Sequence, residues 1–215
     1  MRKVRDFRVL NRYFMWRVRY FSFDPSAITL QKDTRRYAAF FCIELSNLFE
    51  QCVRQAFLSA VLCRPQTLSR SEIRCRTSFA NEQDVLLEAV RIGRNDRYKR
   101  CLRRGYVIQV DEPTWTNFQT LGSICQAIGC DLESRAQLVA TAPKTHLDYL
   151  AALRNYFAHK SQETRHAFES EMIRIGTLPA CDPITFMSRR DFDFPRTNLQ
   201  WICDELSATY RGVIS

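Results

Sequence analysis

Glycine and proline are scarce in this 215-residue chain, with 6 and 7 copies. Scarce glycine disfavours barrels built on many tight turns, and abundant Leu, Arg, Ala and Glu favour helices. The phosphate-binding patterns G-x-x-x-x-G-K-[ST] and G-x-G-x-x-G do not occur, nor do the catalytic patterns G-x-S-x-G and H-E-x-x-H. The sequence therefore predicts a helical protein without a phosphate loop or one of the common hydrolase sites.

Long apolar runs are also missing. No uncharged apolar stretch approaches the ~18 residues that a membrane-spanning helix needs, and no secretory leader is recognisable. We expect a soluble, cytoplasmic protein with no membrane partner.

The nine cysteines are scattered, and none belongs to a C-x-x-C pair. A zinc site normally shows paired ligands at close spacing, so we interpret these cysteines as reduced structural thiols rather than a metal or redox site. The chain has three histidines, which are the other side chains that commonly bind zinc. We expect no metal and no cofactor, and we expect His146 and His166 to be ordinary surface histidines.

Charge is concentrated at the N-terminus. The chain has 32 Lys and Arg against 23 Asp and Glu, a formal net charge of +9. Residues 1–36 hold ten Lys or Arg and three Asp, a net +7, interleaved with seven aromatic residues. Arginine can contact phosphates while aromatic faces stack on bases, so Arg5, Arg8 and Arg12 are candidates for RNA binding. The same pattern suits an amphipathic helix packed on the core, and a transit peptide is a third interpretation.

A second basic run spans residues 91–104, where seven Lys or Arg are opposed by Asp96 alone. Cations near a helix C-terminus complement the helix dipole, which explains part of this run. Contact with a polyanion is the functional alternative.

Periodicity predicts helices over almost the whole chain. The longest covers residues 35–63, and a second runs from an Asn81 cap to Arg104. After a short extended segment from Tyr106 to Val110, further helices cover 114–128, 145–160, 163–175 and 197–211, with a loop over 177–196. We divide the chain into a basic aromatic N-terminal segment (1–34), a helical bundle (35–176), and a loop plus C-terminal helix packed on the same domain (177–215).

The most informative chemistry lies late in the helix expected over 145–160. At 100° per residue, Leu150, Leu153 and Phe157 define its buried face, while Asn155 and His159 share the opposite side. Arg154 lies on the flank between these faces. An imidazole that titrates near neutrality, an amide and a fixed cation therefore come within one and a half turns.

Arg154-Asn155-Tyr156-Phe157-Ala158-His159 resembles the R-x(4)-H motif, in its R-N-x-x-x-H form, of the HEPN (higher eukaryotes and prokaryotes nucleotide-binding) superfamily. The resemblance implies an all-α, HEPN-like bundle over residues 35–176. Many members are metal-independent endoribonucleases that act as dimers in toxin–antitoxin, abortive-infection and CRISPR-associated defence. It also implies that Arg154 and His159 form a catalytic pair supported by Asn155.

Two further residues are candidates for supporting roles. Many family members place an acidic residue in the first long helix, and Glu44 matches it best; its alternative is a solvated polar seam with Asn47 and Gln51. Lys160 could add a phosphate contact. For His159 outside such a motif, a surface histidine without catalytic function would be the default interpretation.

The resemblance implies a metal-independent endoribonuclease that cleaves RNA by attack of the ribose 2′-hydroxyl, acting as a toxin or anti-phage effector. It implies RNA as substrate, a homodimer, and an antitoxin or defence-system protein as a further partner. The first alternative is a non-catalytic HEPN-like module that binds nucleotide, nucleic acid or a protein. The second is an unrelated nucleic-acid-binding bundle, which would rest on the basic N-terminus alone.

Overall fold

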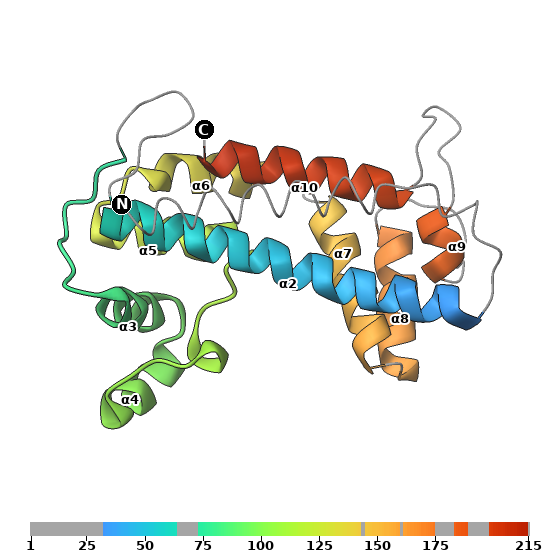
Figure 1. Cartoon of the computed structure of the whole chain (residues 1–215), viewed down its shortest axis with the longest axis horizontal. Helices are drawn as coiled ribbons and strands as arrows, with labels where there is room; N and C mark the ends of the chain where they lie inside the picture. The colour runs from blue at the N-terminus through green and yellow to red at the C-terminus, as the bar shows by residue number, and fades with distance from the viewer. Residues whose placement is uncertain are drawn as a thin grey trace. The chain divides into compact units, whose positions relative to one another are not determined.

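The structure, a computed structural model, describes residues 32–63, 73–142, 145–159, 161–174, 183–188 and 198–214. The predicted RNA contacts Arg5, Arg8 and Arg12 and the predicted supporting residue Lys160 lie outside these ranges. The described elements are α2 (Lys32–Cys63), α3 (Glu82–Gly93), α4 (Asn95–Arg104), the 3-10 helix η2 (Gln109–Asp111), α5 (Phe118–Ile128), α6 (Leu132–Thr141), α7 (Thr145–His159), α8 (Gln162–Arg174), α9 (Pro183–Ser188) and α10 (Asn198–Ile214) (Figure 1).

The expected all-α class is confirmed. In the ranges given above, the one strand pairing is an isolated bridge between Cys75 and Cys130. None of the described helices is long and apolar enough to cross a membrane.

The described residues fall into two compact units. Unit 1 comprises residues 50–63, 73–142 and 209–214, and unit 2 comprises residues 32–49, 145–159, 161–174, 183–188 and 198–208. Helices α2 and α10 contribute residues to both units. The domain boundaries predicted from the sequence stay predictions.

Unit 1 is built around α5, which packs against α6 and α3. Residues at three- and four-residue spacing on α5 are buried, as an amphipathic helix requires: Phe118, Leu121, Ile124, Cys125 and Ile128. The Asn117 side chain caps its start by accepting a hydrogen bond from the Thr120 N–H at 3.1 Å. Gly129 ends it with φ +64°, a left-handed conformation that glycine adopts without steric cost.

Residues 81–104 form two helices rather than the single one predicted. The N-cap prediction is correct, since Asn81 accepts a hydrogen bond from the Asp84 N–H at 3.1 Å. The break follows Gly93, where Arg94 adopts φ −147° and ψ 59°. A Cβ on Gly93 would lie 3.0 Å from side-chain carbons of Pro113 and Thr120. A side chain at this position would crowd both residues, so close packing here favours glycine.

Other details also differ from the sequence prediction. The helix expected over 114–128 starts at Phe118. Residues 109–111 form a 3-10 helix that overlaps the end of the segment expected to be extended. Helix α6 was not predicted, because Gly129 and Asp131 indicate a turn and because apolar residues of 132–141 show only a weak helical periodicity. Helix α9 occupies residues 183–188 of the expected loop, starting at Pro183, a residue suited to the first turn of a helix.

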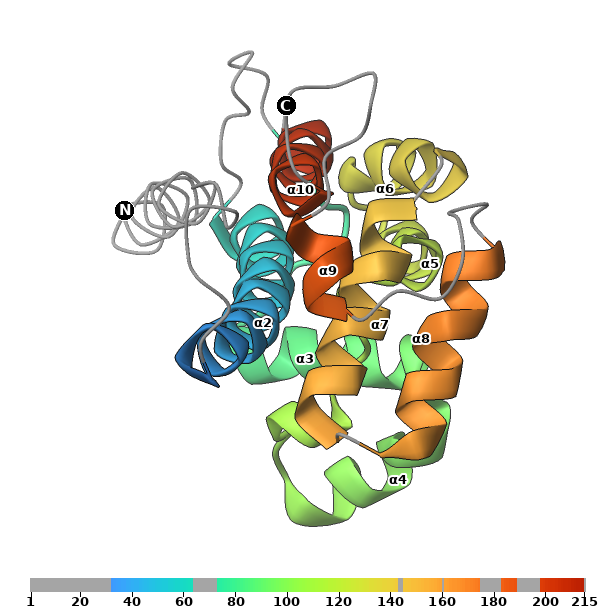
Figure 2. The same cartoon turned by 90° about the vertical axis from the view of Figure 1, so that its right-hand side faces the viewer.

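Unit 2 contains the helix that carries the R-N-x-x-x-H motif. Helices α7 and α8 run side by side (Figure 2). Aromatic rings join the helices of this unit: Tyr149 on α7 lies 4.8 Å from Phe186 on α9 and 6.0 Å from Trp201 on α10, between ring centroids. These contacts hold α7 by its apolar face and leave its other side to solvent.

Candidate functional site

Packing fixes the orientation of α7. The buried residues of this helix follow steps of three, one, three and four: His146, Tyr149, Leu150, Leu153 and Phe157. The expected buried face of Leu150, Leu153 and Phe157 is therefore observed. Because the helix cannot rotate without exposing these side chains, residues on the opposite side face water.

The three motif residues lie on or beside the solvent face. Asn155 and His159 are exposed, and Arg154 is half-buried. The Arg154 guanidinium donates from Nη1 to Asn155 Oδ1 at 3.4 Å. His159 is the last residue of α7, so its imidazole is accessible at a helix end. An accessible imidazole is suited to proton transfer, and the guanidinium on the same helix is suited to binding an anionic oxygen; among the described side chains, no hydrogen bond joins His159 to Arg154 or Asn155.

Asp148, an exposed residue two turns before Asn155 on α7, contacts the neighbouring helix. Its carboxylate accepts from Arg174 Nη2 on α8 at 2.7 Å, and the same guanidinium pairs with Glu171 at 2.5 Å. Asp148 therefore joins α7 to α8 through an ion pair.

Glu44 lies half-buried on the part of α2 that belongs to unit 2. Between described side chains, no hydrogen bond or ion pair joins Glu44 to Arg154, Asn155 or His159. Its supporting role stays a prediction.

The expectation for His146 is wrong, whereas His166 is a surface residue as expected. His146 is 5% exposed, and its ring lies edge-on to Trp201 with centroids 6.3 Å apart. Burial lowers the pKa of His146 to about 4, so the ring is neutral at physiological pH. His146 lies three residues before Tyr149 and therefore on the apolar stripe of the helix. This spacing could have identified His146 as a core residue from the sequence.

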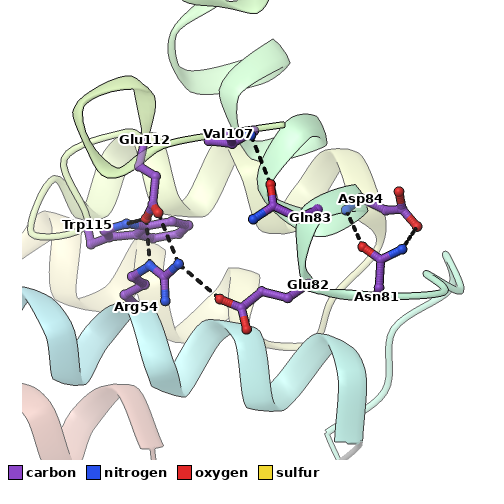
Figure 3. A network of polar contacts seen from close by, with 8 residues as sticks. All are labelled: Arg54, Asn81, Glu82, Gln83, Asp84, Val107, Glu112 and Trp115. Atoms are coloured by element: carbon purple, nitrogen blue, oxygen red, sulfur yellow. Dashed lines mark hydrogen bonds and ion pairs between the residues drawn. The ribbon is translucent and has the colours of Figure 1, made fainter. Parts of the chain in front are cut away.

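Unit 1 also contains a partly buried polar network that no sequence pattern indicated (Figure 3). Arg54 on α2 donates to both carboxylate oxygens of Glu112, at 2.6 and 3.0 Å, and to Glu82 at 3.0 Å. Trp115 Nε1 donates to the same Glu112 carboxylate at 2.8 Å. Since its carboxylates and guanidinium satisfy one another, we assign this network to stability rather than to ligand binding.

The second basic run forms a partly neutralised surface on α4. Arg104 pairs with the buried carboxylate of Asp111, and Arg97 pairs with Asp96 at 3.1 Å. Lys99, Arg100 and Arg103 are exposed and make no ion pair with a described residue. Large apolar side chains are exposed beside them: Leu102, Tyr106, Ile108 and Val110.

Comparisons with protein-family models, with curated proteins and with solved structures found no match. In the part of the chain that the structure describes, no group of three or more His, Cys, Asp or Glu side chains is arranged to hold a metal ion. The candidate functional residues are therefore those of α7 and of the charged surface of α4.

Proposed function

We propose that this chain is a metal-independent endoribonuclease of the HEPN type, with Arg154 and His159 as its catalytic pair and Asn155 supporting them. The observation that carries the proposal is the exposure of Asn155 and His159 on the solvent face of α7, together with the hydrogen bond from the Arg154 guanidinium to Asn155. A core histidine such as His146 could not meet a polymeric substrate, whereas His159 can.

The reaction is a transesterification within the RNA strand. The ribose 2′-oxygen attacks the adjacent phosphorus as its proton passes to a base, and the bond from phosphorus to the 5′-oxygen breaks as that oxygen gains a proton. His159 transfers one of these protons, and Arg154 stabilises the negative charge on the phosphoryl oxygens. The products are a 2′,3′-cyclic phosphate and a 5′-hydroxyl.

The proposed active site is completed by a second copy of the chain in a homodimer. One motif supplies a single imidazole, but two proton transfers occur on opposite sides of the phosphorus. Two copies related by a two-fold axis would supply two imidazoles and two guanidiniums around one RNA strand. The proposal extends to a cytoplasmic toxin or anti-phage effector whose activity an antitoxin or defence-system protein controls.

RNA binding is supported by the unpaired cations of α4. Lys99, Arg100 and Arg103 present three positive charges that no described carboxylate neutralises. Tyr106, which follows α4, is 51% exposed, and the Arg104 guanidinium lies over one face of its ring, 4.7 Å from the centroid. Cations and an exposed aromatic ring suit a single-stranded polyanion. The same surface favours the second candidate function, a non-catalytic module that binds nucleic acid or an acidic protein.

Cleavage of single-stranded RNA in excess EDTA, by wild type and His159→Ala, tests the proposal. We expect wild type to cleave and His159→Ala to lose at least ~10²-fold in rate, because an acid–base group is removed. His166→Ala is the matched control, an exposed histidine on the neighbouring helix, and should retain full activity. Equal cleavage by His159→Ala and wild type would overturn the mechanism; RNA binding without cleavage by wild type would favour the non-catalytic module.

A further inference from the structure

Three cysteines from separate segments of unit 1 converge on one another. Cys75 and Cys130 face each other across the isolated bridge, flanked by hydrogen bonds from Arg76 N to Gly129 O at 3.1 Å and from Asp131 N to Arg74 O at 3.0 Å. This pattern makes them a non-hydrogen-bonded antiparallel pair, the kind whose side chains come closest together.

A second backbone feature brings Cys125 to the same place. The Cys130 N–H donates to Cys125 O at 2.8 Å across the left-handed Gly129, which closes the C-terminus of α5. Side chains at these two positions of a helix C-cap commonly contact each other. Cys130 therefore has one thiol neighbour from the helix end and another from the bridge.

The surroundings of Cys130 favour its thiolate. Hydrogen bonding from the Cys125 thiol lowers the pKa of Cys130, and the Leu132 N–H at the start of α6 and the Cys75 thiol act in the same direction. Burial and the Asp131 carboxylate oppose this shift without reversing it. Helix N-termini and neighbouring donors are the usual origin of reactive cysteines.

Among the other buried cysteines, Cys101 accepts a hydrogen bond from Arg104 Nη2 at 3.8 Å, but burial and the Asp111 carboxylate raise its pKa. Burial raises the pKa of Cys203 to about 12 and that of Cys52 to about 12. The pKa of Cys125 is itself raised, mainly because its proton is held in the hydrogen bond to Cys130. Of these thiols, Cys130 is the one whose surroundings favour the anion.

We propose that Cys130 is an oxidation site, which reacts with hydrogen peroxide and then forms a disulfide with Cys125 or Cys75. The Cys130 thiolate attacks one peroxide oxygen, the O–O bond breaks, and a sulfenic acid and hydroxide form. The second thiol then attacks the sulfenic sulfur, the S–O bond breaks, and that oxygen leaves as water with the thiol proton. Overall, two thiols and one peroxide give one disulfide and two waters.

The bridge geometry is compatible with a Cys75–Cys130 disulfide. Non-hydrogen-bonded antiparallel residues have Cα atoms about 4.5 Å apart, inside the range of about 4.4–6.8 Å that disulfides span. The proposal is independent of ribonuclease activity, because it concerns residues outside α7.

The test is peroxide treatment of the folded wild-type protein, then alkylation under denaturing conditions and mass spectrometry without reductant. Cys125 and Cys130 lie in one tryptic peptide, residues 105–135, which contains no internal Lys or Arg. A Cys125–Cys130 disulfide makes this peptide two hydrogen atoms lighter, and a Cys75–Cys130 disulfide joins it to the peptide that holds Cys75. We expect one of these products, formed at least about tenfold faster than Cys203 is oxidised.

Two variants separate a reactive Cys130 from an ordinary buried thiol. Cys130→Ala should abolish both disulfide products and slow the loss of the first two thiols by at least about tenfold. The matched core variant Cys203→Ala should leave the products and the rate of thiol loss unchanged. If Cys130→Ala does not fold, the order in which the wild-type cysteines are oxidised tests the proposal by itself. Oxidation of Cys203 or Cys52 before Cys130, or a first disulfide without Cys130, would overturn the proposal.

Discussion

Arg54 and Glu112 form a fork-to-fork ion pair, with Nε to Oε2 at 2.6 Å and Nη2 to Oε1 at 3.0 Å. Glu112 is 7% exposed and also accepts from the Trp115 indole. A carboxylate buried in this way is costly unless its partners remain in place, so the pair couples α2 to the segment before α5.

Glu112→Ala should therefore lower the free energy of unfolding by about 1–3 kcal/mol, because the Trp115 N–H would lose its acceptor while the part-exposed Arg54 guanidinium would keep only Glu82 as a partner. The control is Glu88→Ala, which removes an exposed i,i+3 partner of Arg91 and should cost no more than about 1 kcal/mol. Urea denaturation of both variants and wild type measures the difference. Equal losses would mean that the network contributes no more than a surface pair.

Arg154 offers a test of charge against geometry at the proposed site. Arg154→Ala should reduce kcat/KM for RNA by at least ~10²-fold, since charge on the phosphoryl oxygens loses its counter-charge. Arg154→Lys should recover only part of this loss, because an ammonium cannot bind two oxygens as a planar guanidinium does. Arg165→Ala, on exposed α8 surface, is the control and should behave as wild type. Full activity of Arg154→Ala would remove Arg154 from the mechanism.

The proposed dimer is tested by light scattering at micromolar concentration together with cleavage assays. We expect the mass of two chains and a specific activity that falls on dilution, because a single motif supplies one imidazole. A monomer with undiminished activity would contradict the shared site.

The sequence predicted what depends on local periodicity and capping. The apolar stripe of α7, the Asn81 cap and the glycine end of α5 are all local features, and the structure has them. The packing of Pro113 and Thr120 against Gly93, by contrast, joins residues twenty or more positions apart, which no window of helical periodicity contains. The thiol cluster around Cys130 likewise joins residues 75, 125 and 130 through a bridge and a helix cap, so their separation in sequence concealed it.

His146 should make the protein sensitive to mild acid. Its pKa is about 4 in the folded protein and about 6.5 in an unfolded chain, so between these values the unfolded state binds a proton that the folded state does not. The free energy of unfolding should thus fall as pH decreases from about 6.5 to 4, by up to about 3 kcal/mol.

His146→Phe should remove this dependence, because a phenyl ring keeps the contact with Trp201 without titrating. Carboxylates titrate mainly below about pH 5, so thermal unfolding compared between pH 6.5 and 5 isolates the histidine. His166→Gln, at an exposed position, should retain the wild-type slope, and a retained slope in His146→Phe would assign the dependence to another group.

The last prediction separates the two basic regions as RNA-binding surfaces. Cations that contact phosphates release counterions, and each contact contributes about 0.7 to the slope of log affinity against log salt for a single strand. Replacing Lys99, Arg100 and Arg103 with Gln should flatten this slope by about 2 and weaken binding, with little change in turnover at saturating RNA. Replacing Arg5, Arg8 and Arg12 with Gln should do the same if the N-terminal segment guides RNA.

The matched control replaces Arg91, Arg97 and Arg165 with Gln, three arginines that already pair with Glu88, Asp96 and Glu169. All three triple variants remove the same formal charge, so a general effect of net charge would flatten all three slopes equally. Because a phosphate must compete with a carboxylate for a paired guanidinium, specific contacts should leave the control slope close to that of wild type. A wild-type slope for the α4 variant would exclude that helix from RNA binding, and a wild-type slope for the N-terminal variant would favour the alternative in which that segment is an amphipathic helix packed by its apolar stripe.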